Sequence, residues 1–94
     1  MIKVIIERKV SPGLEANYMA AIKATLKDVL DAPGYISSEP LSDINRPTHK
    51  LLITKWASVK AWEDWHKSEQ RTSVVSAISL VLDEPEKITL YHAK

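Results

Sequence analysis

Four short stretches of the chain are rich in β-branched and other apolar residues, and turn-forming residues separate them. This pattern predicts β-strands over residues 2–10, 35–41, 49–57 and 86–93. The second stretch is the weakest, because Pro40 has no amide hydrogen to donate within a sheet. We therefore expect residues 35–41 to lie at a sheet edge or to carry a bulge.

One longer segment has the spacing of an amphipathic helix. In residues 14–32, apolar side chains recur every three or four positions, and charged residues occupy the opposite side. Pro33 and Gly34 follow this segment. Proline cannot continue the hydrogen-bond ladder and glycine accepts a left-handed cap, so the pair predicts the end of the helix.

Two shorter helices are expected after the third strand. Ser58 is a favourable N-cap for a helix over residues 59–67, and Ser68 for a further segment from residue 69 to about 82. With these helices the element order becomes β-α-β-β-α-β, which is the ferredoxin-like arrangement. We expect a single α+β domain over residues 1–94, with an antiparallel sheet and its helices on one face.

The second face of such a sheet is open to water, so its strands should alternate apolar with polar residues. Instead, residues 4–6 and 51–53 place apolar side chains on both faces. No further segment remains to cover the second face, and we therefore expect a homodimer in which a second copy covers it. The alternative is a sheet that leaves a few aliphatic side chains exposed, as many proteins do.

The amino-acid composition excludes some kinds of functional site and makes others unexpected. The chain has no cysteine, which excludes disulfides, thiol nucleophiles and cysteine-ligated metals and suits a reducing compartment. Its formal net charge is +1 and its basic residues are scattered, which gives nucleic-acid binding little support. The longest apolar stretch, 74–82, is too short to span a bilayer, and the N-terminus lacks the layout of a signal peptide. We expect a cytoplasmic protein that binds neither nucleic acid nor membrane.

Motifs for phosphate cradles and hydrolytic sites are absent from the chain. Gly13 and Gly34 are the only glycines, so no glycine-rich loop can form. Glu63 and His66 make one ExxH match, but di-iron bundles need this spacing twice, with extra glutamates. We therefore expect no metal and no cofactor.

Aromatic residues supply the candidate binding site. Trp62, Trp65 and His66 lie at i, i+3 and i+4 of one helix and share a side of it. Trp56 ends the third strand, on the face that it shares with Leu52. If this face meets the helices, these side chains could line an apolar cavity for a flat aromatic ligand. The alternative is that the tryptophans fill the core of a chain without phenylalanine.

Polar candidates lie close to these aromatic residues in the sequence. His66 could serve as an acid or base near neutral pH, or it could be an exposed residue at the edge of a helix. Tyr35 and Arg71 could each supply a polar group to the mouth of a cavity, or could be an ordinary strand and surface residue.

Three places in the chain resemble the antibiotic biosynthesis monooxygenase (ABM) family. They are Ser-Pro-Gly at 11–13, Pro-Gly-Tyr at 33–35, and Trp-Ala-Ser at 56–58 leading to Ala-Trp-Glu-Asp-Trp at 61–65. The resemblance implies a dimeric α+β barrel in which two sheets face each other and the helices lie outside. The family includes cofactor-free oxygenases of polyketide anthrones, quinol oxygenases, haem-degrading oxygenases and many members of no known activity.

The resemblance transfers few site residues to this chain. Trp56 matches a tryptophan of the anthrone-type oxygenases, but Leu52 stands where they have asparagine, and their arginine falls near Val75. Trp65 resembles a tryptophan of the haem-degrading members. Their haem-ligating histidine also falls near Val75, so haem degradation is not expected.

Two functions remain open at this point. The first is a cofactor-independent monooxygenase that acts on a quinol-, phenol- or anthrone-like molecule, with His66 as base and the three tryptophans as walls. The second is a non-catalytic dimeric binding or structural module on the same fold, which the residues at positions 52 and 75 favour.

Overall fold

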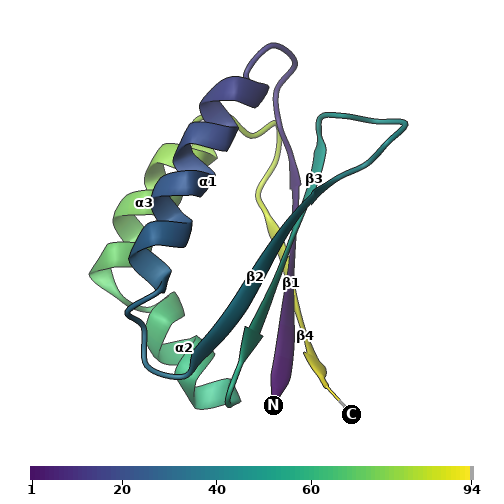
Figure 1. Ribbon diagram of the computed structural model, residues 1–94. Helices are drawn as coiled ribbons and strands as arrows, with labels where there is room; N and C mark the ends of the chain where they lie inside the picture. The colour runs from purple at the N-terminus through teal and green to yellow at the C-terminus, as the bar shows by residue number, and fades with distance from the viewer. Residues whose placement is uncertain (94) are drawn as a thin grey trace.

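A computed structural model describes residues 1–93 of the chain as one sheet and one layer of helices (Figure 1). None of the helices within this range is long and apolar enough to cross a membrane. The expected ferredoxin-like α+β fold is confirmed. The elements in chain order are β1 (Ile2–Lys9), α1 (Glu15–Val29), β2 (Tyr35–Ser42), β3 (His49–Trp56), α2 (Val59–His66), α3 (Glu69–Ser79) and β4 (Lys87–His92).

The strands follow the spatial order β2-β3-β1-β4, and all neighbours are antiparallel. β2 is an edge strand, and its register with β3 shifts between Tyr35 and Ser37. Pro40 is tolerated there because an edge strand has a side on which no amide hydrogen is needed. Of the two alternatives expected for this segment, the edge position is confirmed, and the register shift lies at the start of the strand rather than at Pro40.

Both serine caps are confirmed. The Ala61 N–H donates to Ser58 Oγ at 3.1 Å, at the start of α2. The Arg71 N–H donates to Ser68 Oγ at 3.2 Å, at the start of α3. Because the second cap fixes the first turn of α3, it also fixes where the side chain of Arg71 leaves the helix.

Helix α1 ends at Val29, earlier than the sequence pattern predicts. The Ala32 N–H donates to the Val29 carbonyl, three residues back, at 3.0 Å, so the chain tightens after the helix. Pro33 explains this early end, since its ring disfavours the helical conformation in the residue before it. Gly34 then turns the chain toward β2 with φ +82°.

Any side chain at position 34 is expected to destabilise the fold. An added Cβ would lie 2.5 Å from the Cβ of Ala61 on α2. Gly34→Ala should lower the free energy of unfolding by about 2–4 kcal/mol, from the left-handed conformation and from overpacking. Gly13→Ala is the matched control, because Gly13 has φ +87° but no atom within 4 Å of an added Cβ. Urea unfolding compares the two variants, and equal losses would contradict a role for the Ala61 contact.

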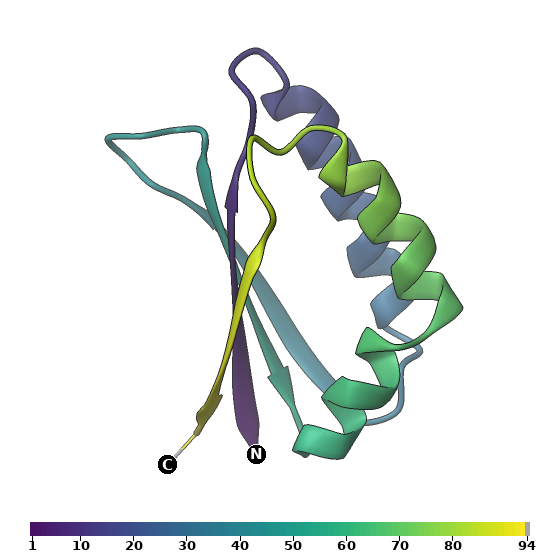
Figure 2. The same cartoon turned by 180° about the vertical axis from the view of Figure 1, so that it is seen from behind.

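Two apolar clusters fill the layer between the sheet and the helices. Figure 2 shows the sheet and the helices that enclose this layer from behind. Arg8 lies between the clusters on β1, since Ile6 belongs to the first and Val10 to the second. The first cluster consists of Ile2, Val4, Ile6, Val29, Leu52, Trp56, Trp62 and Trp65, and the second of Val10, Tyr18, Ile22 and Ile78.

The face of the sheet turned away from the helices is also apolar at its centre. Ile5 lies opposite Ile53 on β3 and opposite Thr89 on β4. Leu51 continues this surface two residues before Ile53, and all four side chains are partly buried in the single chain. The expectation that the central strands carry apolar residues on both faces is therefore confirmed.

Candidate functional site

Four aromatic side chains cluster where β3 meets α2. Trp56 is the centre of the cluster, with ring centroids 5.5 Å from Tyr35, 5.7 Å from Trp62 and 6.4 Å from Trp65. All three indoles are buried, as is Leu52. The structure therefore brings together five of the residues that the sequence singles out.

The polar atoms of this aromatic cluster find partners inside the fold. Trp56 Nε1–H donates to Thr54 Oγ1 at 3.0 Å, and the Thr54 hydroxyl donates to the Val4 carbonyl at 3.4 Å. The Tyr35 hydroxyl donates to Ser38 Oγ at 2.7 Å. The cluster is thus packed and hydrogen-bonded in the manner of a protein core.

Space for a small molecule lies beside α3. Two surface pockets stand out within residues 1–93, and neither of these two is lined by a tryptophan. One, of about 500 Å³, lies among charged residues near the β2–β3 connection. The other, of about 430 Å³, is the α3–β4 groove, between α3 and the segment that leads into β4. Its lining residues are Val75, Ile78, Ser79, Leu82, Asp83, Glu84, Pro85 and Glu86.

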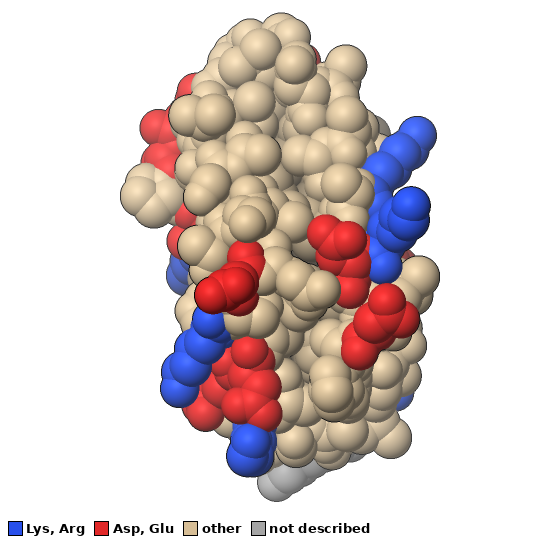
Figure 3. Space-filling view, turned by 90° about the vertical axis from the view of Figure 1, so that its left-hand side faces the viewer, with Lys and Arg blue, Asp and Glu red and all other residues tan. Residues whose placement is uncertain are grey.

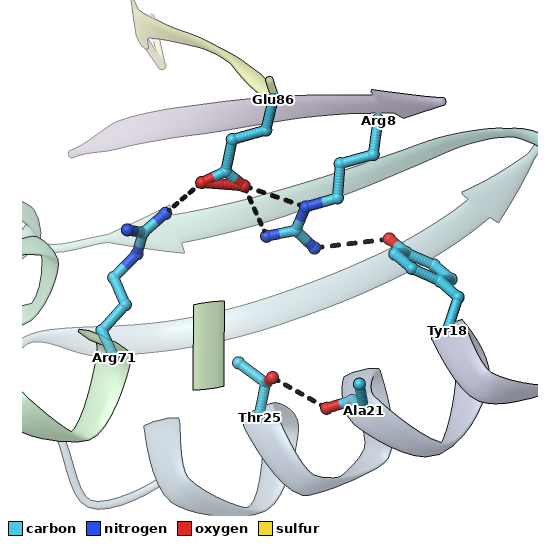
Figure 4. A network of polar contacts seen from close by, with 6 residues as sticks. All are labelled: Arg8, Tyr18, Ala21, Thr25, Arg71 and Glu86. Carbon is cyan, nitrogen blue, oxygen red and sulfur yellow. Dashed lines mark hydrogen bonds and ion pairs between the residues drawn. The ribbon is translucent and has the colours of Figure 1, made fainter. Parts of the chain in front are cut away.

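Glu86 immediately precedes β4, and its carboxylate bonds to two buried arginines (Figure 4). Arg8 donates from Nε and Nη2 to Glu86 Oε2, at 2.9 Å and 2.8 Å. Arg71 donates from Nη2 to Glu86 Oε1 at 2.8 Å. Arg8 Nη1 also donates to the Tyr18 hydroxyl at 3.3 Å. We call these three charged residues the Arg8–Glu86–Arg71 network.

The network is buried and carries a net positive charge. Arg8 is 4% exposed and Arg71 6% exposed. Burial alone would raise the pKa of the Glu86 carboxyl, but the two guanidiniums hold this pKa below its ordinary value of 4.5. Glu86 is therefore ionised at neutral pH, and the network sums to one positive charge.

Charged side chains are distributed unevenly over the outer surface of the helix layer. In Figure 3, charged side chains gather in the lower half of this surface and along its margins. Residues 72–82, which include most of α3, contain no charged residue. Arg71 is the last charge before this stretch, and its side chain turns inward to Glu86.

His66 lies at the exposed end of α2 and stacks on Trp62, with ring centroids 5.2 Å apart and an angle of 26° between the ring planes. Partial burial lowers the pKa of His66 below its ordinary 6.5, and the nearby positive charge of Arg71 lowers this pKa further. Arg71 Cζ lies 5.4 Å from the centroid of the Trp62 ring. His66 is therefore a neutral imidazole at pH 7, next to a buried cation.

Two residues of this site were not found from the sequence, Arg8 and Glu86. Arg8 carried a usable signal, because it occupies a core-facing position in the strand pattern of Ile2, Val4 and Ile6.

Val75, where the family resemblance places an arginine or a histidine, lines the α3–β4 groove.

The fold and site together define a small ferredoxin-like α+β domain with an aromatic cluster at the β3–α2 junction and a buried ion network beside a groove. Residues 1–76 match the model of the family described as antibiotic biosynthesis monooxygenase (ABM), and the chain belongs to this family. The resemblance noted from the sequence is thereby confirmed.

Solved structures share the fold at low sequence identity. A conserved protein from Methanosarcina mazei Go1 has TM-score 0.92 and 19% identity, covering 99% of this chain and 92% of that one. Rv0793 from Mycobacterium tuberculosis has TM-score 0.88 and 15% identity, covering 99% and 93%. SnoaB, a cofactor-independent oxygenase from Streptomyces nogalater, has TM-score 0.86 and 14% identity, covering 99% and 93%. No curated protein sequence matches the chain significantly.

Proposed function

We propose that this chain is a cofactor-independent monooxygenase of the ABM type that acts on an aromatic, quinol-, phenol- or anthrone-like small molecule. Family membership supports the class of reaction. The observation that carries the proposal is His66, a neutral imidazole stacked on Trp62 beside the cation of Arg71. A base next to a buried positive charge is what deprotonation of a weakly acidic substrate requires.

In this proposal the substrate enters through the α3–β4 groove and directs its reactive ring toward Arg71 and His66. Behind these two side chains lies the packed aromatic cluster with Leu52 and Tyr35. His66 removes a proton from the substrate, and Arg71 stabilises the resulting anion electrostatically. With an anthrone, molecular oxygen then oxidises the ring CH₂ group to a carbonyl. One oxygen atom enters the product and the other leaves as water with the two hydrogens.

His66→Asn is expected to reduce kcat for anthrone oxidation by about 100-fold, while KM changes little, because the base is lost but the binding walls remain. Oxygen uptake with anthrone measures both constants. The wild-type rate should be level at neutral pH and fall as the medium is made more acidic than pH 6.5, since the pKa of His66 lies below that value.

His49→Asn is the control for that variant. His49 begins β3 and lies in the other pocket, so its loss should leave the rate unchanged. Equal rates for His66→Asn and the wild type would remove His66 as the base. An absence of oxygen uptake by the wild type with anthrones and quinols alike would contradict the monooxygenase function itself.

We further propose that the chain forms a homodimer through the outer face of its sheet. Ile5, Leu51 and Ile53 give this face an apolar centre that the single chain leaves partly exposed. Ile53→Lys should therefore convert the dimer to monomers, because burying an unpaired charge in the interface is costly. Sedimentation equilibrium measures the mass, and a wild type with the mass of one chain would contradict this proposal.

A non-catalytic dimeric binding or structural module is the second candidate. One observation favours it: the indoles of Trp56, Trp62 and Trp65 fill the core, and neither pocket is lined by them. The oxygen-uptake experiment separates the two candidates, because a binding module would retain its ligand without any turnover.

A further inference from the structure

The connection between β2 and β3 presents an isoleucine to solvent. Ile44 is 94% exposed, the most exposed large apolar side chain within residues 1–93. One exposed aliphatic residue needs no explanation by itself, because many proteins have them. Two further features set Ile44 apart. The turn that carries it is held in one shape, and this turn projects from the sheet.

Hydrogen bonds hold the turn around Ile44. One carboxylate oxygen of Asp43 accepts from the N–H groups of Asn45 and Arg46, at 2.8 Å and 3.1 Å. The other oxygen accepts from the Arg46 guanidinium at 3.1 Å and 3.0 Å. The Asp43 N–H donates to the His49 carbonyl at 3.0 Å, which closes the connection. Because the turn is already ordered, placing Ile44 against a second molecule costs little further entropy.

The turn projects toward the side on which the second copy of the proposed dimer lies. In Figure 1, the connection between β2 and β3 leans away from the helices, beyond the outer face of the sheet. The pocket beside this connection also includes Glu84 and Pro85, which line the α3–β4 groove as well. The turn and the groove therefore lie at the same end of the sheet.

Twofold symmetry can bring the turn of one copy to the groove of the other. β2 and β4 are the two opposite edges of the sheet. If the twofold axis runs along the strands between two facing sheets, β2 of one copy lies beside β4 of the other. The same axis keeps the matching ends of both sheets together. The turn that follows β2 then lies next to the groove that precedes β4.

The α3–β4 groove is complementary to this turn in polarity and charge. Its apolar lining residues are Val75, Ile78, Leu82 and Pro85. Its three charged lining residues are all acidic, whereas residues 43–50 contain two basic residues and one acidic residue. Opposite charges across an interface favour encounter and fix its register. The groove thus offers apolar cover for Ile44 and an acidic rim for the basic turn around it.

We infer that Ile44 of each copy closes the mouth of the α3–β4 groove of the other copy. The groove is then complete only in the dimer, because the second copy supplies one of its walls. The inference rests on the proposed function, since it adds a residue to the groove through which the substrate enters. An apolar side chain at this mouth keeps water from the reacting groups.

A cysteine cross-link tests this contact, because the chain has no cysteine of its own. Ile44→Cys and Ser79→Cys chains are produced together, purified and oxidised with glutathione disulfide. Ser79 is exposed and lines the groove. Non-reducing electrophoresis should show a two-chain product that neither variant forms alone. Each chain has one thiol, so the product joins two copies whose Cα atoms approach to about 4.4–6.8 Å.

Ser73→Cys is the matched control for Ser79→Cys. Ser73 is also exposed on α3, but it does not line the groove. Together with Ile44→Cys it should give no two-chain product. If the wild type has the mass of a dimer and the Ser79 pair cross-links no more than the Ser73 pair, the inference is overturned. The dimer through the outer face of the sheet would still stand.

Ile44→Asp provides a second measurement that needs no cross-link. A carboxylate at this position would meet the acidic rim of the groove, so the dimer dissociation constant should rise by about tenfold or more. Leu30→Asp is the control, because Leu30 is also an exposed apolar residue and does not line the groove. It should leave the constant unchanged. Sedimentation equilibrium measures both constants, and equal values for the two variants would overturn the inference.

The outcome is separable from that of the proposed function. Oxygen uptake by a dimer that does not form the cross-link leaves the monooxygenase function standing and overturns this inference. The cross-link without oxygen uptake from any aromatic substrate establishes the closed groove and contradicts the monooxygenase function. A wild type with the mass of one chain overturns the inference together with the dimer.

Discussion

Replacing Glu86 with glutamine is expected to lower the free energy of unfolding by about 3–5 kcal/mol, because the change leaves two buried guanidiniums facing a neutral amide. The Glu86 side chain is only 14% exposed, so water screens these charges little. For a domain of this size, the loss corresponds to a decrease in Tm of at least about 12 °C. Urea unfolding followed by circular dichroism measures the change.

Glu84→Gln is the matched control. Glu84 pairs with Lys9 at 3.3 Å, and both side chains are at least half exposed. Removing this pair should change stability by less than about 1 kcal/mol. Similar losses for the two variants would contradict a special contribution from the buried network.

Acid should act on the wild type through the same carboxyl group. The pKa of Glu86 in the folded chain lies below 4.5, its ordinary value in the unfolded chain. Between the folded-state pKa and pH 4.5, the unfolded chain therefore binds more protons than the folded chain. The stabilisation is therefore complete above pH 4.5 and is lost as the pH falls through the folded-state pKa. In Glu86→Gln this part of the pH dependence should be absent, so its unfolding free energy should vary less with pH in acid.

Trp56→Ala is expected to cost about 3–5 kcal/mol of unfolding free energy, the range found for large aromatic side chains removed from cores. Trp56 is fully buried and contacts Tyr35, Trp62 and Trp65 at the centre of the aromatic cluster. Its removal leaves a cavity that these neighbours cannot fill without losing their own contacts. Thermal and urea unfolding measure the loss.

Trp56→Phe is the control for that cavity. It keeps a ring in place and loses the Nε1–H bond to Thr54, whose hydroxyl still donates to the Val4 carbonyl. We expect it to retain at least half of the stability that Trp56→Ala loses. A loss below about 1 kcal/mol for Trp56→Ala would show that the cluster collapses around the missing indole.

Local sequence signals predicted most of the fold, because each of them acts within a few residues. Ser58 and Ser68 cap helices through hydrogen bonds to residues three positions ahead. Pro40 indicates an edge strand because of a single missing donor. The end of α1 was predicted too late, since the tight turn from Val29 to Ala32 depends on how Pro33 constrains the residue before it.

The candidate site was predicted where the spacing within one helix or one strand places side chains together. Trp62 and His66 are four residues apart on α2, so their stacking follows from the period of the helix. Arg8 and Glu86 are 78 positions apart, and although Arg8 occupies a core-facing position of its strand, Glu86 taken alone resembles a surface charge. They meet because β1 and β4 are neighbours in the sheet, a pairing that no local pattern records.

The position of Glu86 late in the chain has a consequence for the order of folding. Arg8 and Arg71 are both synthesised before Glu86, so neither has this carboxylate as a counter-ion until the segment before β4 reaches β1. Until then, packing α3 against the sheet would bury two cations without the anion that joins them. Docking of α3 is thereby coupled to closure of the last strand. A chain that ends before residue 86 would lack the Glu86 carboxylate, which allows the helices to pack against the sheet. It would also lack β4, one edge strand of the sheet.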